Sequence, residues 1–303
     1  MRRSSATAKP HPAGRPARWP LVPYLFIAPA MVGLGLFKLY PIMEGLRLSF
    51  YEVRPIARTQ VFIGLANFVE LVQDPVILQA TWNTLLFNLV VTPAQVALAL
   101  GLAVLVSRKV PGIQAFRSVF FMPAVISLVV ASIVWKLMYA PDSGLLNGLL
   151  GLAGISRQPF LTSVGQAMPA LMGMVVWKGV GYWMVILFAG LKEIPESVVE
   201  AATVDGASPL RRFFAITLPL LSPVLVFVVV ADTIINFLLF VPVYVMTQGG
   251  PAEATTLLMF EVYRNAFVYT RFGYAAAIST ALLAVIAVAV SIQMRFLRVE
   301  FEY

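Results

Sequence analysis

The polar side chains that interrupt the apolar stretches of this sequence are the residues that could do chemistry. Lys178 lies in the middle of one stretch, next to the aromatic residues Tyr182 and Trp183. Asp232 and Asn236 lie four residues apart in another stretch, so a helix would place them on one face. Carboxylate and amide groups hydrogen-bond hydroxyls, an ammonium group binds anions, and aromatic rings stack on C–H groups. These five residues are therefore candidates for lining the path of a polar solute.

Two further interpretations of the same polar residues stay open. A charged group at bilayer depth costs about 2.5 kcal/mol or more, so it needs a partner. Lys178 and Asp232 could pair with each other, or the polar groups could fix the packing of helices through interhelical hydrogen bonds. Three other charged residues in or near apolar stretches are expected at interfaces with their charged ends in water: Glu44, Lys136 and Glu261.

Composition excludes several kinds of active site. The sequence has no cysteine, and its single histidine is His11. Disulfides, metal sites built from cysteine or histidine, and Ser-His or Cys-His pairs within the membrane are therefore excluded. A phosphate-binding GxxxxGKS/T loop is also missing, so if ATP drives this protein, ATP and magnesium must bind another chain. We expect no metal, no cofactor and no enzymatic activity on this chain.

The bulk composition predicts an all-α integral membrane protein. Of the 303 residues, 60% are hydrophobic and 12% are charged, against about 45–50% and about 25% in soluble domains. A helix needs about 20 apolar residues to cross about 30 Å of hydrocarbon. On this criterion we expect six transmembrane helices, with kinks or breaks at Pro93 and Pro123. They lie near residues 21–49, 80–107, 113–140, 167–190, 218–246 and 273–295.

The distribution of basic residues predicts the orientation of these helices. Residues 1–18 are basic and rich in Pro, Ala and Ser, so we expect a disordered tail there. The next apolar run continues past Ala28-Pro29-Ala30 to Tyr40, which favours an uncleaved span over a signal peptide. If both termini lie in the cytoplasm, most Lys and Arg of the short loops are on the inner side. Because the basic residues gather at span ends, the net charge of +8 does not indicate nucleic-acid binding.

A long polar stretch, Glu193–Pro223, interrupts the apolar second half of the chain. It predicts two short helices folded about a tight turn. Pro195 suits the first position of one helix, and Gly206 suits a left-handed residue that ends it. Ser208 can cap a second helix that begins at Pro209. The orientation given above places this stretch in the cytoplasm.

Acidic residues and an alanine pair mark the first of these helices. Glu193, Glu196 and Glu200 would share one face if the helix extends back far enough, and the alanines keep the helix slim. The residues Glu200-Ala201-Ala202, Asp205-Gly206-Ala207, Ile216, Leu218 and Pro219 resemble the EAA signature of the transmembrane subunits of binding-protein-dependent ABC importers. In that family this loop is the coupling helix that docks on the ATPase subunit. The resemblance implies a coupling loop over residues 193–217, with the role carried by Glu196, Glu200, Ala201, Ala202, Asp205, Gly206 and Pro209. A capped connector between two spans is the alternative.

Two segments on the expected outer side resemble the carbohydrate-uptake branch of these importers. They are Ile63-Gly64-Leu65-Ala66-Asn67-Phe68 and Met246-Thr247-Gln248-Gly249-Gly250-Pro251, the second of which is similar to the TxGGP turn of the maltose-type first subunit. The resemblance implies a bundle of six transmembrane helices of the type I importer kind in the bacterial cytoplasmic membrane. The implied partners are a second permease subunit, two ATPase subunits, an extracytoplasmic solute-binding protein and membrane lipid. The implied solute is a sugar or a compound of the glycerol-3-phosphate type.

Two other classes of membrane protein fit the composition. A membrane-embedded enzyme acting on lipid-linked substrates would need a cluster of Asp, Glu or His near the membrane surface, and the acidic cluster of this sequence lies along one helix. A stand-alone secondary transporter would favour internal repeats, and residues 21–140 and 167–295 show no convincing one. We therefore expect a permease subunit that forms half of a translocation path and couples it to a separate ATPase.

Overall fold

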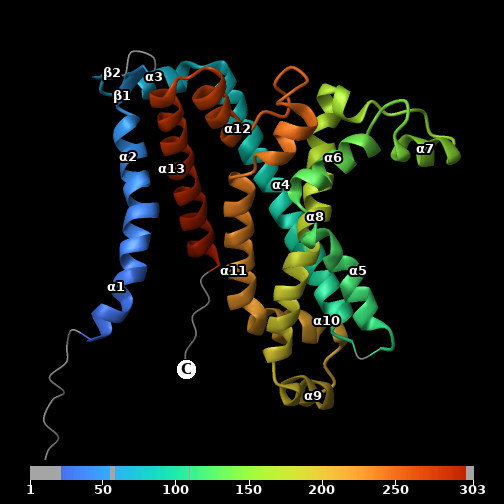
Figure 1. Ribbon diagram of the computed structural model, residues 1–303. Helices are drawn as coiled ribbons and strands as arrows, with labels where there is room; N and C mark the ends of the chain where they lie inside the picture. The colour runs from blue at the N-terminus through green and yellow to red at the C-terminus, as the bar shows by residue number, and fades with distance from the viewer. Residues whose placement is uncertain (1–21, 55–58, 109, 298–303) are drawn as a thin grey trace, which may run out of the picture. The chain divides into compact units, whose positions relative to one another are not determined.

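The computed structural model describes residues 22–54, 59–108 and 110–297, which are mainly helical (Figure 1). The basic tail expected over residues 1–18 lies outside this range. The chain forms two compact units, Met1–Gly45 and Leu46–Tyr303. The first unit contains α1 (Val22–Leu34), the π-helical turn η1 (Gly35–Leu39) and most of α2 (Tyr40–Leu48). These three elements follow one another, and Pro23–Leu48 is an apolar helix of 26 residues.

The second unit holds the remaining elements. It begins with the antiparallel hairpin of β1 (Tyr51–Arg54) and β2 (Thr59–Phe62), in which Tyr51 lies opposite Phe62. Its longer helices are α4 (Pro75–Val106), α5 (Ile113–Val125), α6 (Leu128–Met138), α8 (Val164–Glu193), α11 (Leu218–Phe237) and α13 (Phe272–Phe296). Its shorter elements are α3 (Ala66–Gln73), α7 (Leu145–Leu152), η2 (Phe160–Thr162), α9 (Glu196–Val204), α10 (Pro209–Arg212), η3 (Phe213–Thr217), η4 (Val243–Thr247), α12 (Leu258–Tyr263) and η5 (Arg264–Val268).

Five helices in the described residues are long and apolar enough to cross a membrane, and the pair α5 and α6 makes six if it counts as one bent span. Local sequence explains where the longest of them, α4, begins. Asp74 caps it, because Oδ1 of Asp74 accepts a hydrogen bond from the backbone N–H of Val76 at 2.9 Å. Pro75 occupies the first helical position, where a missing N–H costs nothing.

Two of the expected spans differ from the observed helices. The single helix expected over residues 113–140 is instead α5 and α6, bent by 97° at a short break. Pro123 lies in the last turn of α5, where it removes one backbone hydrogen bond, and the chain is extended at Ile126. The helix expected over residues 218–246 runs instead over Pro209–Phe237, because η3 joins α10 to α11 without interruption.

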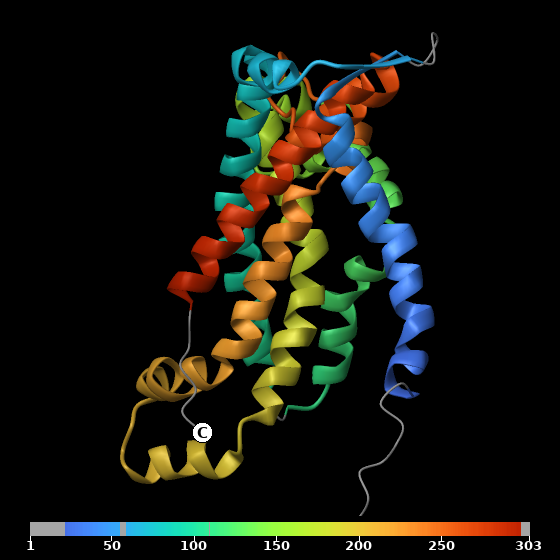
Figure 2. The ribbon, with the colours of Figure 1, turned by 90° about the vertical axis from the view of Figure 1, so that its left-hand side faces the viewer.

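Helices α4, α8 and α11 pack together at the centre of the second unit, and α5 packs against α8 (Figure 1). Glycines of α8 permit these close approaches. A Cβ at Gly181 would overlap the backbone carbonyl of Phe120 in α5, and one at Gly190 would lie 2.9 Å from side-chain carbons of Leu221 and Val224 in α11. Small residues allow membrane helices to approach closely, so α8 is the helix around which its neighbours are arranged. Beyond its end lies α9, placed crosswise to the long helices (Figure 2).

Candidate functional site

The turn between α9 and α10 has the geometry that the sequence predicts. Gly206 has a φ of +75°, in the left-handed region that glycine adopts without strain. Oγ of Ser208 accepts a hydrogen bond from the backbone N–H of Arg211 at 3.3 Å, and Pro209 is the first residue of α10. Pro195 differs from expectation, since it is the cap before α9 and not its first residue.

The acidic face is shorter than the sequence suggested. Glu193 is the last residue of α8, and the extended backbone at Ile194 and Pro195 separates it from α9. The three glutamates therefore do not share one helix face, and the expectation that included Glu193 is wrong. Glu196 and Glu200, one helical turn apart on α9, do share a face and line the same pocket.

The alanine pair divides between two environments. Ala202 is buried, with 7% of its surface exposed, whereas Ala201 is exposed. The backbone N–H of Ala207 donates to the carbonyl of Ala202 at 3.0 Å, which closes the turn onto α9. The guanidinium of Arg212 donates to the hydroxyl of Thr203, so α10 is tied to α9 through their side chains as well. Asp205 and Gly206 lie exposed at the tip of the turn.

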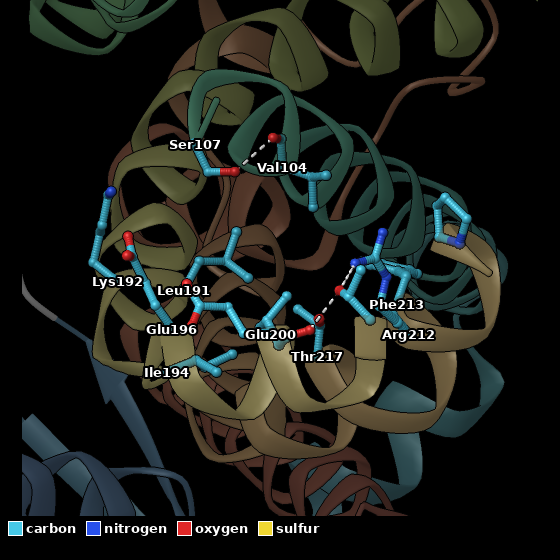
Figure 3. A pocket seen from close by; sticks show the side chains of 13 residues that line it. Val104, Ser107, Leu191, Lys192, Ile194, Glu196, Glu200, Arg212, Phe213 and Thr217 are labelled. Atoms are coloured by element: carbon cyan, nitrogen blue, oxygen red, sulfur yellow. Dashed lines mark hydrogen bonds between the residues drawn. The ribbon is translucent and has the colours of Figure 1, made fainter. Parts of the chain in front are cut away.

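A pocket of about 510 Å³ lies beside α9 (Figure 3). Its wall combines the ends of α4 and α8 with α9, α10 and η3, and two basic residues, Lys192 and Arg212, line it together with the acidic pair Glu196 and Glu200. The other lining residues are Val104, Ser107, Leu191, Ile194, Val199, Thr203, Pro209, Phe213 and Thr217. Helix α9 thus shares this pocket with the ends of α4 and α8 and with η3, which continues into α11.

The polar residues of the fifth apolar stretch form a buried hydrogen-bond network. Nε1 of Trp183 donates to Oδ1 of Asp232 at 2.7 Å. Nδ2 of Asn236 lies within hydrogen-bond distance of three acceptors: Oδ2 of Asp232 at 3.1 Å, Oγ1 of Thr92 at 3.1 Å and Oε1 of Gln95 at 3.2 Å. All five side chains are buried. The network links α4, α8 and α11, as interhelical hydrogen bonds do in membrane bundles.

The partner of Lys178 lies on another helix. Its Nζ donates to the backbone carbonyl of Ala124 in α5 at 3.0 Å, while the Asp232 carboxylate takes its hydrogen bonds from Trp183 and Asn236. In the described part of the chain, Lys178 and Asp232 are therefore not paired with each other. Tyr182 is 48% exposed and contacts the Trp183 ring edge-on at 4.9 Å between centroids.

Sequence reasoning missed the residues of α4 that complete the network. Thr92 and Gln95 are buried between α4 and its neighbours, and Nε2 of Gln95 also donates to the backbone carbonyl of Val175 in α8 at 2.8 Å. The signal was present in the sequence, because Asn88, Thr92 and Gln95 recur at spacings of four and three within an apolar run. Polar residues at helical spacing in a span predict a face turned toward other helices.

The segment between η4 and α13 is held by side chains from α4. Nδ2 of Asn83 donates to the backbone carbonyls of Glu253 at 3.1 Å and Thr256 at 3.0 Å.

Glu261 of α12 is 2% exposed, so the expectation that its charged end reaches water is wrong. Its Oε1 accepts hydrogen bonds from Thr256 and from Arg264, both at 2.8 Å. Burial raises the pKa of the Glu261 carboxyl, although these hydrogen bonds and the charge of Arg264 oppose the shift.

Comparisons with known proteins agree with this architecture. A family model described as "Binding-protein-dependent transport system inner membrane component" matches residues 95–298. The permease protein UgpA of the sn-glycerol-3-phosphate transport system of Salmonella choleraesuis (strain SC-B67) is 35% identical over 288 residues, covering 95% of this chain and 97% of that protein. The corresponding protein of Escherichia coli (strain UTI89 / UPEC) is 34% identical over the same shares of the two chains.

Two solved structures share the fold. One is the crystal structure of a bacterial ABC transporter involved in the import of the acidic polysaccharide alginate, with a TM-score of 0.75 and 23% identity, covering 91% of this chain and 95% of that chain. The other is the alginate transporter in complex with a periplasmic protein bound to an alginate pentasaccharide, with a TM-score of 0.75 and 22% identity, covering 91% and 94%. At this level of identity, the likeness extends to the fold.

Proposed function

The chain belongs to the family of inner membrane components of binding-protein-dependent transport systems, and from this premise we propose how it couples ATP hydrolysis to the passage of a solute. It is a permease subunit of an ABC importer, embedded in the bacterial inner membrane by several helices. ATP hydrolysis belongs to a separate ATPase subunit, and a second permease and a solute-binding protein complete such a system.

We propose that α9 is the coupling helix. The observation that carries this proposal is the left-handed turn at Gly206, between α9 and the start of the fifth span. This turn leaves Glu200 and Asp205 exposed at one end of the bundle. Glu200 is the ionic contact to the ATPase, and Gly206 lets the helix seat. Glu196, Ala201, Ala202 and Pro209 complete the contact or hold its shape. Two copies of the ATPase close on ATP and Mg²⁺. The coupling helix moves with them and transmits this movement to α8 and α11.

The movement of α9 opens and closes the bundle to the two sides of the membrane in turn. We propose that Lys178, Tyr182, Trp183, Asp232 and Asn236 belong to the solute path in this cycle. In this structure Tyr182 is exposed, whereas the hydrogen-bonded side chains of Trp183, Asp232 and Asn236 are buried. A solute therefore contacts these three residues only after α8 and α11 separate. A hydrogen-bond network that can part in this way would exchange its internal partners for hydroxyl groups of a solute.

We propose a phosphate-bearing polyol of the glycerol-3-phosphate type as the solute, with a sugar as the second candidate. The two relatives described above, which match over nearly the whole chain, are permeases of sn-glycerol-3-phosphate systems. The half-buried ammonium of Lys178 is suited to an anionic solute, and the polar network to its hydroxyls. Uptake of radiolabelled sn-glycerol-3-phosphate and of maltose by proteoliposomes containing the whole importer distinguishes the two. Transport of neither compound would remove both candidates.

Co-purification tests the coupling assignment. Glu200→Arg should remove the ATPase from the complex purified from native membranes, while the second permease stays. The reason is that the variant presents a reversed charge to the surface of the ATPase on which α9 docks. Glu193→Arg is the matched control, since it makes the same charge change on α8, outside α9. Loss of the ATPase from both variants, or from neither, would contradict the proposed role of Glu200.

The orientation is tested with single cysteines, because the natural chain has none. Asp205→Cys should react with a membrane-impermeant maleimide that is added to the cytoplasmic side of the membrane. Asp142→Cys, in the connection between α6 and α7, should react when the reagent is added to the outer side. The reverse pattern of labelling would place α9 on the outer side and end the coupling proposal.

A further inference from the structure

A second pocket lies at the end of the bundle opposite α9, and neither the coupling helix nor the proposed solute path uses it (Figures 1 and 2). Its wall is made by β1, the loop that follows β2, α3, and the segment that runs from η5 into the first turn of α13. The pocket has a volume of about 630 Å³, within the range of about 300–1,000 Å³ for small-molecule sites. It is therefore large enough to hold a ligand.

The pocket lies at the level where two membrane-spanning helices begin. Arg271 directly precedes α13. The hydroxyl of Tyr274, in the first turn of α13, donates to Oδ2 of Asp74, the cap of α4, at 3.1 Å. The first residues of a span mark the boundary between the hydrocarbon and the lipid headgroups, and tyrosine is enriched in this layer. The pocket is therefore at the depth of the headgroups.

Two ion pairs line the pocket and balance its charge. Nε of Arg54 lies 2.8 Å from Oε1 of Glu52. Nη2 of Arg271 lies 2.6 Å from Oε2 of Glu70. All four side chains are between 44% and 61% exposed, and ion pairs at such exposure contribute little to stability. A ligand that carries a cation and an anion can therefore replace the partners of both kinds of side chain, whereas a purely anionic ligand would meet two carboxylates.

Asn67 fixes the wall of the pocket. It is 6% exposed, and its Nδ2 donates to the backbone carbonyls of Ser49 at 2.8 Å and Tyr51 at 3.2 Å. The carbonyl of Tyr51 approaches α13 so closely that a Cβ at Gly273 would overlap it. The hairpin, α3 and the start of α13 thus hold one another in place. A site whose wall is fixed before the ligand arrives loses little entropy on binding.

Exposed apolar side chains surround the charged pocket. Leu65 and Val69 lie beside the lining residues of α3, and Phe267 and Val268 directly precede the lining residue Tyr269. More than half of the surface of each of these four apolar residues is exposed. Apolar surface gains free energy when it is removed from water, so a ligand with an apolar part is favoured here. The pocket and its rim together fit an amphiphile.

We propose that this pocket binds the headgroup of a zwitterionic phospholipid, one that carries a phosphate and an ammonium group, such as phosphatidylethanolamine. The phosphate accepts hydrogen bonds from Arg54 and Arg271, which are strong because both partners are charged. The ammonium donates to Glu52 and Glu70, and the acyl chains lie along the apolar rim. If α9 is cytoplasmic, as proposed above, the lipid belongs to the outer leaflet. The chemistry of binding does not depend on that orientation.

Site-specific photo-crosslinking tests the lipid. The whole importer is reconstituted in vesicles with equal amounts of phosphatidylethanolamine and the anionic phosphatidylglycerol. Benzoylphenylalanine replaces Val268, beside the pocket, or Val288, an equally exposed valine farther along α13. After irradiation, mass spectrometry measures the ratio of the two lipids attached to each position. The ratio of phosphatidylethanolamine to phosphatidylglycerol should be about threefold higher at position 268, as expected for the free energy of one exposed charge pair.

Two results of this experiment overturn the proposal. One is an equal lipid ratio at positions 268 and 288, which would mean that the pocket does not select a headgroup. The other is an adduct of position 268 with the solute-binding protein and none with lipid, which would mean that a protein covers the pocket.

Removal of one carboxylate tests the charge balance. Glu52→Gln gives the pocket a net positive charge, so the enrichment at position 268 should disappear or turn toward phosphatidylglycerol. Glu52 pairs with a residue of its own strand, so this variant keeps the tie between α3 and α13. Glu70→Gln is the second variant, with the same expected result. Asp142→Asn is the matched control, because it makes the same change in an exposed ion pair with Arg157 outside the pocket. Unchanged enrichment in both glutamine variants overturns the proposal.

A soluble compound with the same headgroup separates a lipid from a free phosphodiester. Glycerophosphoethanolamine carries the phosphate and the ammonium without acyl chains, and an excess of it should leave the lipid adduct at position 268 unchanged. Loss of the adduct would overturn the lipid as the occupant and assign the pocket to a soluble diester.

The adduct ratio is measured without ATP and without transport, so it does not depend on the proposed function. If an importer that takes up solute shows no enrichment at position 268, the lipid site fails and the proposed function stands. If position 268 shows the enrichment in an importer that transports neither candidate solute, the solute assignment fails and the lipid site stands.

Discussion

The indole N–H of Trp183 donates to the carboxylate of Asp232 across 2.7 Å and joins α8 to α11 at a point where both side chains are buried. These helices flank the α9–α10 segment, so the bond lies between the two spans that a moving coupling helix would displace. A buried polar contact of this kind fixes helix register. In the proposed transport cycle, its opening would offer hydrogen-bonding groups to a solute. The same bond can thus serve the closed bundle and the open path.

Removal of the Asp232 carboxylate is expected to destabilise the bundle. Asp232→Ala leaves the Trp183 indole N–H without its acceptor and takes one acceptor from Asn236, at a cost of about 1–3 kcal/mol. Asp232→Asn should cost less, because its amide oxygen can still accept from Trp183. The midpoint of thermal inactivation of the purified complex measures both. Asp142→Ala is the control, since its side chain is 92% exposed, and equal midpoints for Asp232→Ala and this control would contradict the prediction.

The close contact of α8 with α5 predicts sensitivity to a single methyl group. A Cβ at Gly181 would overlap the backbone carbonyl of Phe120, which cannot move as a side chain does, so Gly181→Ala should lose about 1–3 kcal/mol of stability. Gly165→Ala on the same helix meets no atom within 4 Å and should be neutral or stabilising, because alanine favours helix by about 1 kcal/mol. The two variants are compared by thermal inactivation in detergent. If Gly181→Ala lost less stability than Gly165→Ala, α5 and α8 would not be packed this closely.

The left-handed turn predicts a selective loss of coupling. At Gly206 an added Cβ meets no atom within 4 Å, so Gly206→Val acts through backbone strain alone. A non-glycine residue in this region costs about 1–2 kcal/mol, which corresponds to about a tenfold loss of the docked turn. We expect solute uptake and solute-stimulated ATPase activity to fall by that factor while the amount of chain in the membrane is unchanged. Gly206→Asn should keep activity, because asparagine tolerates the left-handed region. Full uptake by Gly206→Val would refute the coupling role of this turn.

The buried carboxyl of Glu261 predicts a dependence of stability on pH. Because burial raises its pKa in the folded chain above the ordinary value of 4.5, the folded state favours the protonated form. Its contribution to stability is present in full below pH 4.5 and is lost as the pH rises through the raised pKa. Glu261→Gln does not titrate, so the stability of wild type relative to this variant should fall as the pH rises from 4.5. Thermal inactivation of both proteins across this range measures it. A difference that is flat, or that grows in favour of wild type, would mean that Arg264 outweighs burial.

The sequence by itself determined the features that depend on neighbouring residues. The apolar stretches predict the membrane-spanning helices because about 20 consecutive apolar residues have few other stable environments. The turn at Gly206 and the cap at Ser208 follow from the local backbone preferences of glycine, serine and proline, and the structure has both. The motif over Glu200–Pro219 pointed to the importer family, to which the chain belongs.

Only the tertiary structure decided which partner each polar residue of the spans takes. Lys178 bonds a carbonyl of α5, and Asn236 reaches Thr92, 144 residues away in the chain. Helical spacing places such residues on a face, but it does not say which helix that face meets. A break near Pro123 was expected, but the size of the bend, 97° between α5 and α6, and the burial of Glu261 were missed for the same reason. Contacts between distant segments depend on how whole helices pack, and that is a property of all their side chains together.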